Sequence, residues 1–194
     1  TLVFLVIWAC KKDMDITCAD CDLTHIDYNP KPYKIIRPAG FGEMPIPTDN
    51  PLTEEGIRLG RFLFYDPVLS SDSTISCGSC HKQEFGFTDG KAVSPGVNGT
   101  LGTRSSMSLF NVGYYDTGLF WDGRSSTLEK QALEPVENPV EMHEHWPNVE
   151  KKLQRSKFYP EMFRKAFGIK EKKEMTRELA AKALAQFMRT ILSY

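Results

Sequence analysis

The segment Cys77-Gly78-Ser79-Cys80-His81 places two thiols and an imidazole within five consecutive positions. This C-x-x-C-H spacing is typical of covalent attachment of a c-type haem. Two thiols about one helical turn apart can add to the two vinyl groups, and the next residue can direct its imidazole at the iron. We therefore predict one covalently attached haem c, bound through Cys77 and Cys80, with His81 as the proximal iron ligand.

A second C-x-x-C pair, Cys18 and Cys21, lies upstream and has no histidine after it. A second haem is therefore not expected there. The two pairs together could supply four thiolates to zinc, but zinc does not require His81. We favour a local disulfide between Cys18 and Cys21, because cysteines of exported proteins are usually paired or modified.

The first nine residues, TLVFLVIWA, form an apolar run that is too short to span a bilayer and fits the hydrophobic region of a signal peptide. No methionine or basic stretch precedes it, so we expect a partial gene product that begins within the signal. Ile7-Trp8-Ala9-Cys10 resembles a bacterial lipobox, in which the cysteine is lipidated after cleavage. We expect residues 1–10 to be this remnant, and a periplasmic or cell-envelope protein attached to the membrane only through a lipid anchor at Cys10. The alternative is an apolar N-terminus without lipid.

The chain has 194 residues, of which 41% are hydrophobic, and its 24 basic and 25 acidic side chains give a net charge of −1. This length suits one ordinary domain with a tail. The balanced charge argues against nucleic acid or an anionic membrane surface as the main partner.

The pattern of helix signals predicts a mainly α fold. Residues 11–52 are rich in proline and lack helical periodicity, which predicts an extended N-terminal arm. Thr53 can cap a helix that ends near residue 66, and the glycine- and serine-rich residues 70–123 predict a long functional loop. Further helices are expected at 126–133, 147–155, 158–167 and from Thr176 to the end. We therefore expect a cytochrome c-like haem domain with long loops at residues 53–194.

The sixth iron ligand separates two kinds of haem protein. Electron carriers usually fill both axial positions, whereas an enzyme needs one that is open. Met107 is the sulfur candidate after His81, and no histidine occurs between His81 and Trp121. Since the sequence forces no ligand, an open distal side remains compatible with it.

From residue 51 to 194 the chain resembles the N-terminal half of the bacterial dihaem cytochrome c peroxidase family, which includes the MauG-like proteins. The matching stretches, in order, are LGRFLFYD at 59–66, CGSCH at 77–81, FTDG at 87–90, FWDGR at 120–124, Gln131, Pro135 and VEM at 140–142. The resemblance implies a peroxidatic haem in this N-terminal domain. It also implies a second, electron-donating haem in a C-terminal domain.

The resemblance assigns roles to three side chains. Gln131 and Glu141 match the distal residues of the family, where a carboxylate beside peroxide can carry a proton from one oxygen to the other. The amide of Gln131 would orient peroxide or water. Trp121 matches a tryptophan between the two haems, which implies an electron conduit.

Three more residues are expected at the cofactor. Arg104 and Arg124 are candidates for binding the haem propionates, because guanidinium pairs well with carboxylates. Pro135 belongs to the matching haem-pocket stretch. Surface solvation or structural ion pairs are the alternative for both arginines.

The sequence departs from the family pattern in three places. The loop at 91–102 has no histidine, with Asn98 near the corresponding place, which favours an open haem site as in the MauG-like branch. Ser105 stands where the family has an asparagine near calcium, and serine is a poorer calcium ligand. No second C-x-x-C-H occurs, so we expect the second haem domain on a missing segment or on another polypeptide.

These observations predict a peroxidase, or its peroxidatic half, that reduces hydrogen peroxide to water with electrons from a cytochrome-type donor or a second haem domain. One alternative is a monohaem electron-transfer cytochrome with Met107 as sixth ligand. Another is a MauG-like oxidase of a protein or organic substrate.

Overall fold

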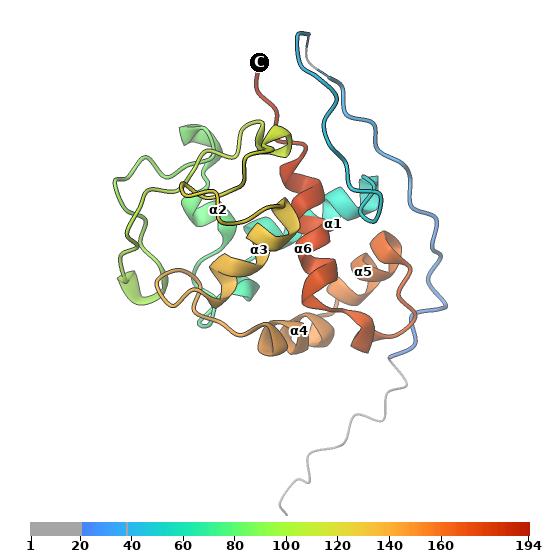
Figure 1. Ribbon diagram of the computed structural model, residues 1–194. Helices are drawn as coiled ribbons and strands as arrows, with labels where there is room; N and C mark the ends of the chain where they lie inside the picture. Colours follow the sequence, from blue (N-terminus) through green and yellow to red (C-terminus); the bar gives the residue numbers. More distant parts are fainter. Residues whose placement is uncertain (1–20, 38) are drawn as a thin grey trace, which may run out of the picture.

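The computed structural model describes residues 21–37 and 39–194, and this part of the chain is helical (Figure 1). Its α-helices are α1 (Glu54–Tyr65), α2 (Cys77–Cys80), α3 (Leu128–Glu137), α4 (Trp146–Arg155), α5 (Tyr159–Phe167) and α6 (Arg177–Met188). Short 3-10 turns and isolated β-bridges connect them, and the described ranges contain no β-strand. The expectation of a mainly α, cytochrome c-like fold is confirmed.

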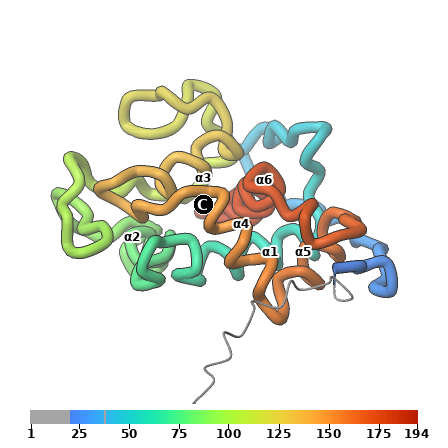
Figure 2. The backbone as a smooth tube through the Cα atoms, turned by 90° about the horizontal axis from the view of Figure 1, so that it is seen from below, coloured from blue at the N-terminus to red at the C-terminus, as the bar shows by residue number. Residues whose placement is uncertain are grey.

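Helix α6 lies at the centre of the fold and packs mainly on α1 and α3, while α1 also packs on α5 (Figures 1 and 2). The crossing of α1 and α6 is close at Gly60, where a Cβ atom would collide with the carbonyl oxygen of Ala183. Large side chains fill the core, and the largest fully buried ones are Trp146, Tyr159, Phe64 and Phe163.

Local capping interactions set the ends of the helices. The Thr53 side chain accepts a hydrogen bond from the Gly56 N–H (3.0 Å), and Thr176 caps α6 in the same way. Gly168 ends α5 with a φ of +71°, which suits glycine at this position. Helix α6 ends at Met188, earlier than the apolar spacing through Leu192 predicts, and the chain then turns.

Helix α3 is longer than the expected 126–133 and includes Pro135. Proline has no N–H and usually marks a helix end. Here the following loop donates hydrogen bonds to the carbonyls of the last helical turn. The bonds are Trp146 Nε1 to Leu133 O (3.1 Å), Asn138 N to Glu134 O (3.0 Å), Met142 N to Pro135 O (3.1 Å) and Glu144 N to Val136 O (2.8 Å). The helix end and the loop at 138–146 therefore form one rigid unit.

The described part of the arm, residues 21–37 and 39–52, contains no helix and runs along the α5 side of the molecule (Figure 1). Leu23 is buried, and its N–H donates to the Lys170 carbonyl (2.8 Å). Cys21 is disulfide-bonded, whereas Cys18, its expected partner, lies outside the described residues, as do residues 1–10 and the Cys10 lipidation site.

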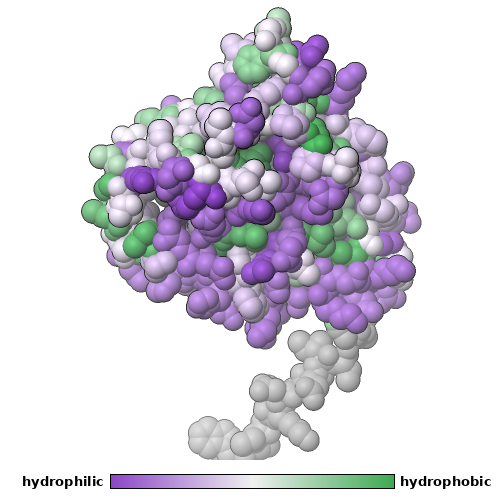
Figure 3. All heavy atoms as spheres, viewed as in Figure 1, coloured by the Kyte–Doolittle hydropathy of each residue, from purple (hydrophilic) through white to green (hydrophobic). Residues whose placement is uncertain are grey.

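The face in Figure 3 is mostly hydrophilic, with hydrophobic residues in separate patches. None of the helices in the described ranges is both long and apolar enough to cross a membrane.

Candidate haem site

A cavity of about 350 Å³ lies between α2, α3, α6 and the long loop that follows α2. Its lining is largely apolar and includes Phe64, Ile75, Leu109, Val112, Leu184 and Met188. Polar side chains enter it from α3, from the loop after α3 and from the loop at 94–108. The cavity is therefore mostly apolar with a few polar groups, as cofactor sites usually are.

The two cysteines of the C-x-x-C-H segment form the two ends of the short helix α2, and both thiols line the cavity. Both are free of disulfide bonds. The next residue, His81, closes this turn, because its N–H donates to the Cys77 carbonyl (2.9 Å). The structure thus brings the three predicted attachment residues together on one side of the cavity.

The ring of His81 is oriented by the backbone. Its Nδ1 lies 2.9 Å from the Phe87 carbonyl oxygen, which can only accept, so Nδ1 bears the proton and Nε2 is left as a ligand atom. Burial lowers the pKa of His81, which favours the neutral imidazole that binds iron. Two free thiols, one oriented imidazole and an apolar chamber fit a covalently attached haem.

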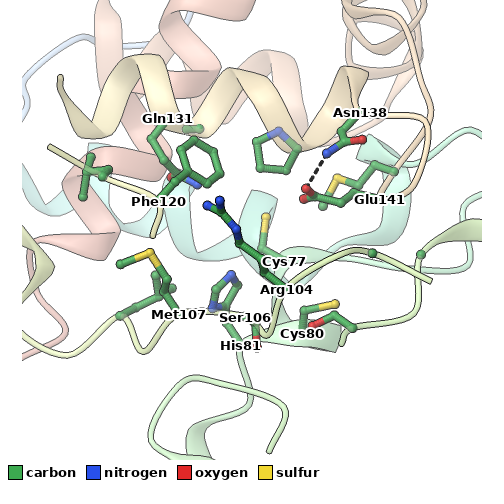
Figure 4. Close-up of a pocket in the computed structure, with 18 of the residues that line it drawn as sticks. Cys77, Cys80, His81, Arg104, Ser106, Met107, Phe120, Gln131, Asn138 and Glu141 are labelled. Atoms are coloured by element: carbon green, nitrogen blue, oxygen red, sulfur yellow. Dashed lines mark hydrogen bonds between the residues drawn. The ribbon is translucent and has the colours of Figure 1, made fainter. Parts of the chain in front are cut away.

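Gln131 and Glu141 approach the cavity from the side opposite His81 (Figure 4). Gln131 extends from α3, and Glu141 lies on the loop after it. Pro135 also lines the cavity. Met107 lies on the same side as His81, and its backbone is next to the His81 ring. The structure therefore places Met107 beside His81 and away from Gln131 and Glu141.

The Glu141 carboxyl is held inside the cavity. Asn138 Nδ2 donates to Glu141 Oε1 (2.6 Å), and the Val97 N–H donates to the Glu141 carbonyl (2.9 Å). Burial raises the pKa of Glu141, and the Asn138 hydrogen bond and the Arg124 charge offset only part of this effect. At Gly96 a Cβ would collide with the Val140 carbonyl oxygen and lie 2.7 Å from that of Glu141, so only glycine allows this approach.

Sequence reasoning missed Asn138 and Gly96. The Asn-Pro pair at 138–139 could have indicated the turn that places Glu141. No sequence signal would have found Gly96, because its role depends on two loops meeting in space.

The two arginines proposed for the propionates are already in contact with carboxylates. Arg104 NH1 donates to Asp122 Oδ2 (3.0 Å). Arg124 NH1 donates to Asp122 Oδ1 (3.1 Å), and its Nε donates to Glu134 Oε2 (2.9 Å). The Arg124 guanidinium also lies 3.5 Å from the centroid of the Phe120 ring. Arg104 has fewer protein partners and extends into the cavity (Figure 4), so it is the better placed of the two for a cofactor carboxylate.

Trp121 lies at the edge of the cavity and is 58% exposed. Its Nε1 donates to the Ser105 carbonyl (2.8 Å), which fixes the indole plane. A large aromatic side chain exposed and oriented in this way is typical of a contact surface.

Comparison with known proteins agrees with this geometry. The pattern of the family described as di-haem cytochrome c peroxidase matches residues 54–194. The chain is 37% identical to the methylamine utilization protein MauG of Methylorubrum extorquens, over 77% of this chain and 42% of that protein. It is 35% identical to the cytochrome c peroxidase Ccp of Escherichia coli K12, over 77% of this chain and 31% of that protein.

Among solved structures, a MauG-like protein associated with microbial copper homeostasis superposes with a TM-score of 0.76 at 33% identity, over 83% of this chain and 47% of that one. The chain thus spans less than half the length of each of these three relatives. The range matched by the family pattern contains the C-x-x-C-H segment, Gln131 and Glu141. The chain therefore belongs to the di-haem cytochrome c peroxidase family.

Proposed function

We propose that this chain forms the peroxidatic half of a haem c peroxidase that reduces hydrogen peroxide to water. One observation supports this proposal above the others. Gln131 and Glu141 enter an apolar cavity from the side opposite a histidine whose Nε2 is free to bind iron. An electron carrier has no use for a proton-transferring carboxyl group at that position.

In the proposed site Cys77, Cys80 and His81 would hold one haem c, which would supply electrons to peroxide. The overall reaction is H₂O₂ + 2 H⁺ + 2 e⁻ → 2 H₂O. Glu141 takes a proton from one peroxide oxygen and returns it to the other, which becomes the leaving water. The Gln131 amide orients peroxide or water by hydrogen bonding, and the apolar lining excludes bulk water.

The electrons come from a cytochrome-type donor, directly or through a second haem domain. Support for a second domain comes from the relatives, which are more than twice as long as the matched region. Trp121 is exposed at the cavity edge and would contact this partner as the electron conduit. The extended arm at 11–52 and the haem domain at 53–194 would form one half of that assembly.

The test is the substitution Glu141→Gln in the haem-loaded protein. We expect the peroxide reaction to slow by about 10²–10⁴-fold, because general acid–base catalysis contributes this much. Rapid mixing with peroxide, followed in the visible spectrum, measures the rate. Glu137→Gln, at the exposed end of α3, is the matched control.

Two outcomes would contradict the proposal. One is a Glu141→Gln rate equal to that of the wild type. The other is a low-spin haem that is inert to peroxide in both redox states, which would indicate an electron-transfer cytochrome with a sixth ligand such as Met107.

A MauG-like oxidase is the second candidate. One observation favours it: the sequence of the loop at 91–102 contains no histidine. Peroxide-dependent oxidation of an added protein or organic substrate, without turnover of a reduced cytochrome, would identify this activity.

We also propose that the protein resides in the periplasm or cell envelope, attached through lipid on Cys10. The lipobox-like segment and the disulfide at Cys21 support this location. Expression of the full reading frame with Cys10→Ser should abolish labelling by a radioactive fatty acid and move the protein from the membrane to the soluble fraction. Unchanged fractionation would contradict the anchor.

A further inference from the structure

We propose that Asn138 is the positioning residue for Glu141: its amide occupies Oε1 of that carboxyl and leaves Oε2 as the atom that takes up and releases the proton. This inference rests on the proposed function, because it deepens the role of Glu141 in the peroxide reaction.

The orientation of the Asn138 amide is fixed by two contacts. Its Oδ1 accepts a hydrogen bond from the Val140 N–H (3.2 Å), so its Nδ2 must point the other way, toward Glu141. Nδ2 then donates to Glu141 Oε1 at 2.6 Å, a short bond of the charge-assisted type. Rotating the amide would place its oxygen against the carboxyl and break both bonds.

The backbone holds the two residues at this separation. The Asn138 carbonyl accepts from the Glu141 N–H and from the His143 N–H, both at 3.0 Å. The Asn138 N–H caps α3 by donating to the Glu134 carbonyl (3.0 Å), and the Val97 N–H holds the Glu141 carbonyl. The pair is thus fixed to α3 on one side and to the haem-site loop on the other.

The second carboxyl oxygen of Glu141, Oε2, is available for proton transfer. Among the described residues, none donates a hydrogen bond to Glu141 Oε2, although the carboxyl lines the cavity. A proton on Oε2 leaves the Asn138 bond to Oε1 intact, whereas a proton on Oε1 would face the N–H donor. The proton of Glu141 is therefore directed to one atom, and the carboxyl need not rotate during transfer.

The same hydrogen bond also affects the pKa of Glu141. Burial and the negative Glu134 raise the pKa of Glu141, while the Asn138 N–H and the positive Arg124 lower it. An N–H donor stabilises the carboxylate form, so its loss raises the pKa of Glu141 further and extends the protonated form to higher pH.

Two variants distinguish a role of Asn138 in positioning the Glu141 carboxyl from a role in holding the turn through the Val140 N–H. Asn138→Asp keeps an oxygen that can accept from the Val140 N–H but replaces the donor to Glu141 with a second carboxylate. Asn138→Ala removes both interactions. Infrared titration of the haem-loaded protein without peroxide follows the carboxyl band of Glu141, which Glu141→Gln identifies by its disappearance.

We expect the Glu141 midpoint to rise by about one pH unit or more in both variants, and most in Asn138→Asp, because a neighbouring like charge adds to the lost donor. The acid limb of the peroxide rate profile should move by the same amount, and the rate should recover at high pH. An unchanged infrared midpoint in both variants would overturn the proposal.

A midpoint shift in Asn138→Ala alone would also overturn it, because that result assigns Asn138 to the turn. A shifted midpoint in both variants with an unchanged peroxide rate would leave the proton placement intact. That result would instead contradict the proposed function of Glu141, so the two failures can be told apart.

Discussion

Arg189, in the turn after α6, donates two hydrogen bonds to the Glu129 carboxylate in α3, at 2.7 Å to Oε1 and 3.2 Å to Oε2. The arginine is buried, with 4% of its surface exposed. Asn50 of the arm also donates to Glu129 Oε1 (2.7 Å). The Arg189–Glu129 pair, together with Asn50, thus joins the arm, α3 and the turn after α6. Glu129 lies two residues before Gln131 in the sequence.

Removing one partner of this pair should strongly destabilise the fold. Glu129→Gln leaves the Arg189 charge buried without a counter-ion, and we expect a loss of about 3–5 kcal/mol in the free energy of unfolding. Guanidinium denaturation of the haem-loaded protein measures it. Glu161→Gln breaks the exposed pair with Lys165 and should cost about 0.5 kcal/mol or less. Equal losses in both variants would contradict the stabilising role of the buried pair.

The contribution of Glu129 should depend on pH. Burial raises its pKa, but the hydrogen bonds from Arg189 and Asn50 outweigh burial, and the pKa of Glu129 is lowered from 4.5. Its stabilisation is therefore complete above the unfolded pKa and is lost as the pH falls through the folded one. The stability gap between wild type and Glu129→Gln should narrow in acid. A gap that stays constant from neutral pH into acid would contradict this linkage.

Gly96→Ala should disturb the site without unfolding the protein. The new Cβ would press on the carbonyls of Val140 and Glu141, so the loop must move and Glu141 with it. We expect the peroxide reaction to slow by about 10²-fold, since misplacement by about 1 Å has this effect. Gly102→Ala is the control, because its nearest neighbour is 3.4 Å away. Similar rates in the two variants would argue against a fixed Glu141.

Gly60→Ala should lower stability at the crossing of α1 and α6. The added methyl group collides with the backbone of Ala183, which cannot yield without separating the helices. We expect a loss of about 1–3 kcal/mol from overpacking, more than the helix propensity gained. Thermal unfolding measures it, and Gly42→Ala, which has no neighbour within 4 Å, should be nearly neutral.

The rate of the wild-type peroxide reaction should fall on the acid side at a pH above the ordinary pKa of a glutamate carboxyl. Burial raises the pKa of Glu141 from 4.5, so its protonated form persists to higher pH and the base is lost there. The rate should therefore fall as the pH drops through this raised value. Stopped-flow measurements over pH should show this limb in the wild type and not in Glu141→Gln; a limb of the same midpoint in both would assign it to another group.

The local elements were predictable because their signals lie within a few residues. Thr53, Thr176 and Gly168 cap helices through their own side chains or backbone, so these ends match expectation. The end of α3 was misjudged, because the groups that satisfy its last carbonyls come from the loop at 138–146. These tertiary hydrogen bonds let the helix continue through Pro135.

The sequence by itself determined the family, through its ordered motifs. It also predicts the haem-attachment residues, because thiol and imidazole chemistry at C-x-x-C-H spacing depends only on neighbouring positions, and it predicts Gln131 and Glu141 as distal residues. Only the tertiary structure decided that Met107 lies on the His81 side, that Arg124 is already paired with acidic residues, and that Asn138 holds Glu141 by one oxygen. These features depend on distances between segments brought together by packing, and composition and spacing do not encode such distances.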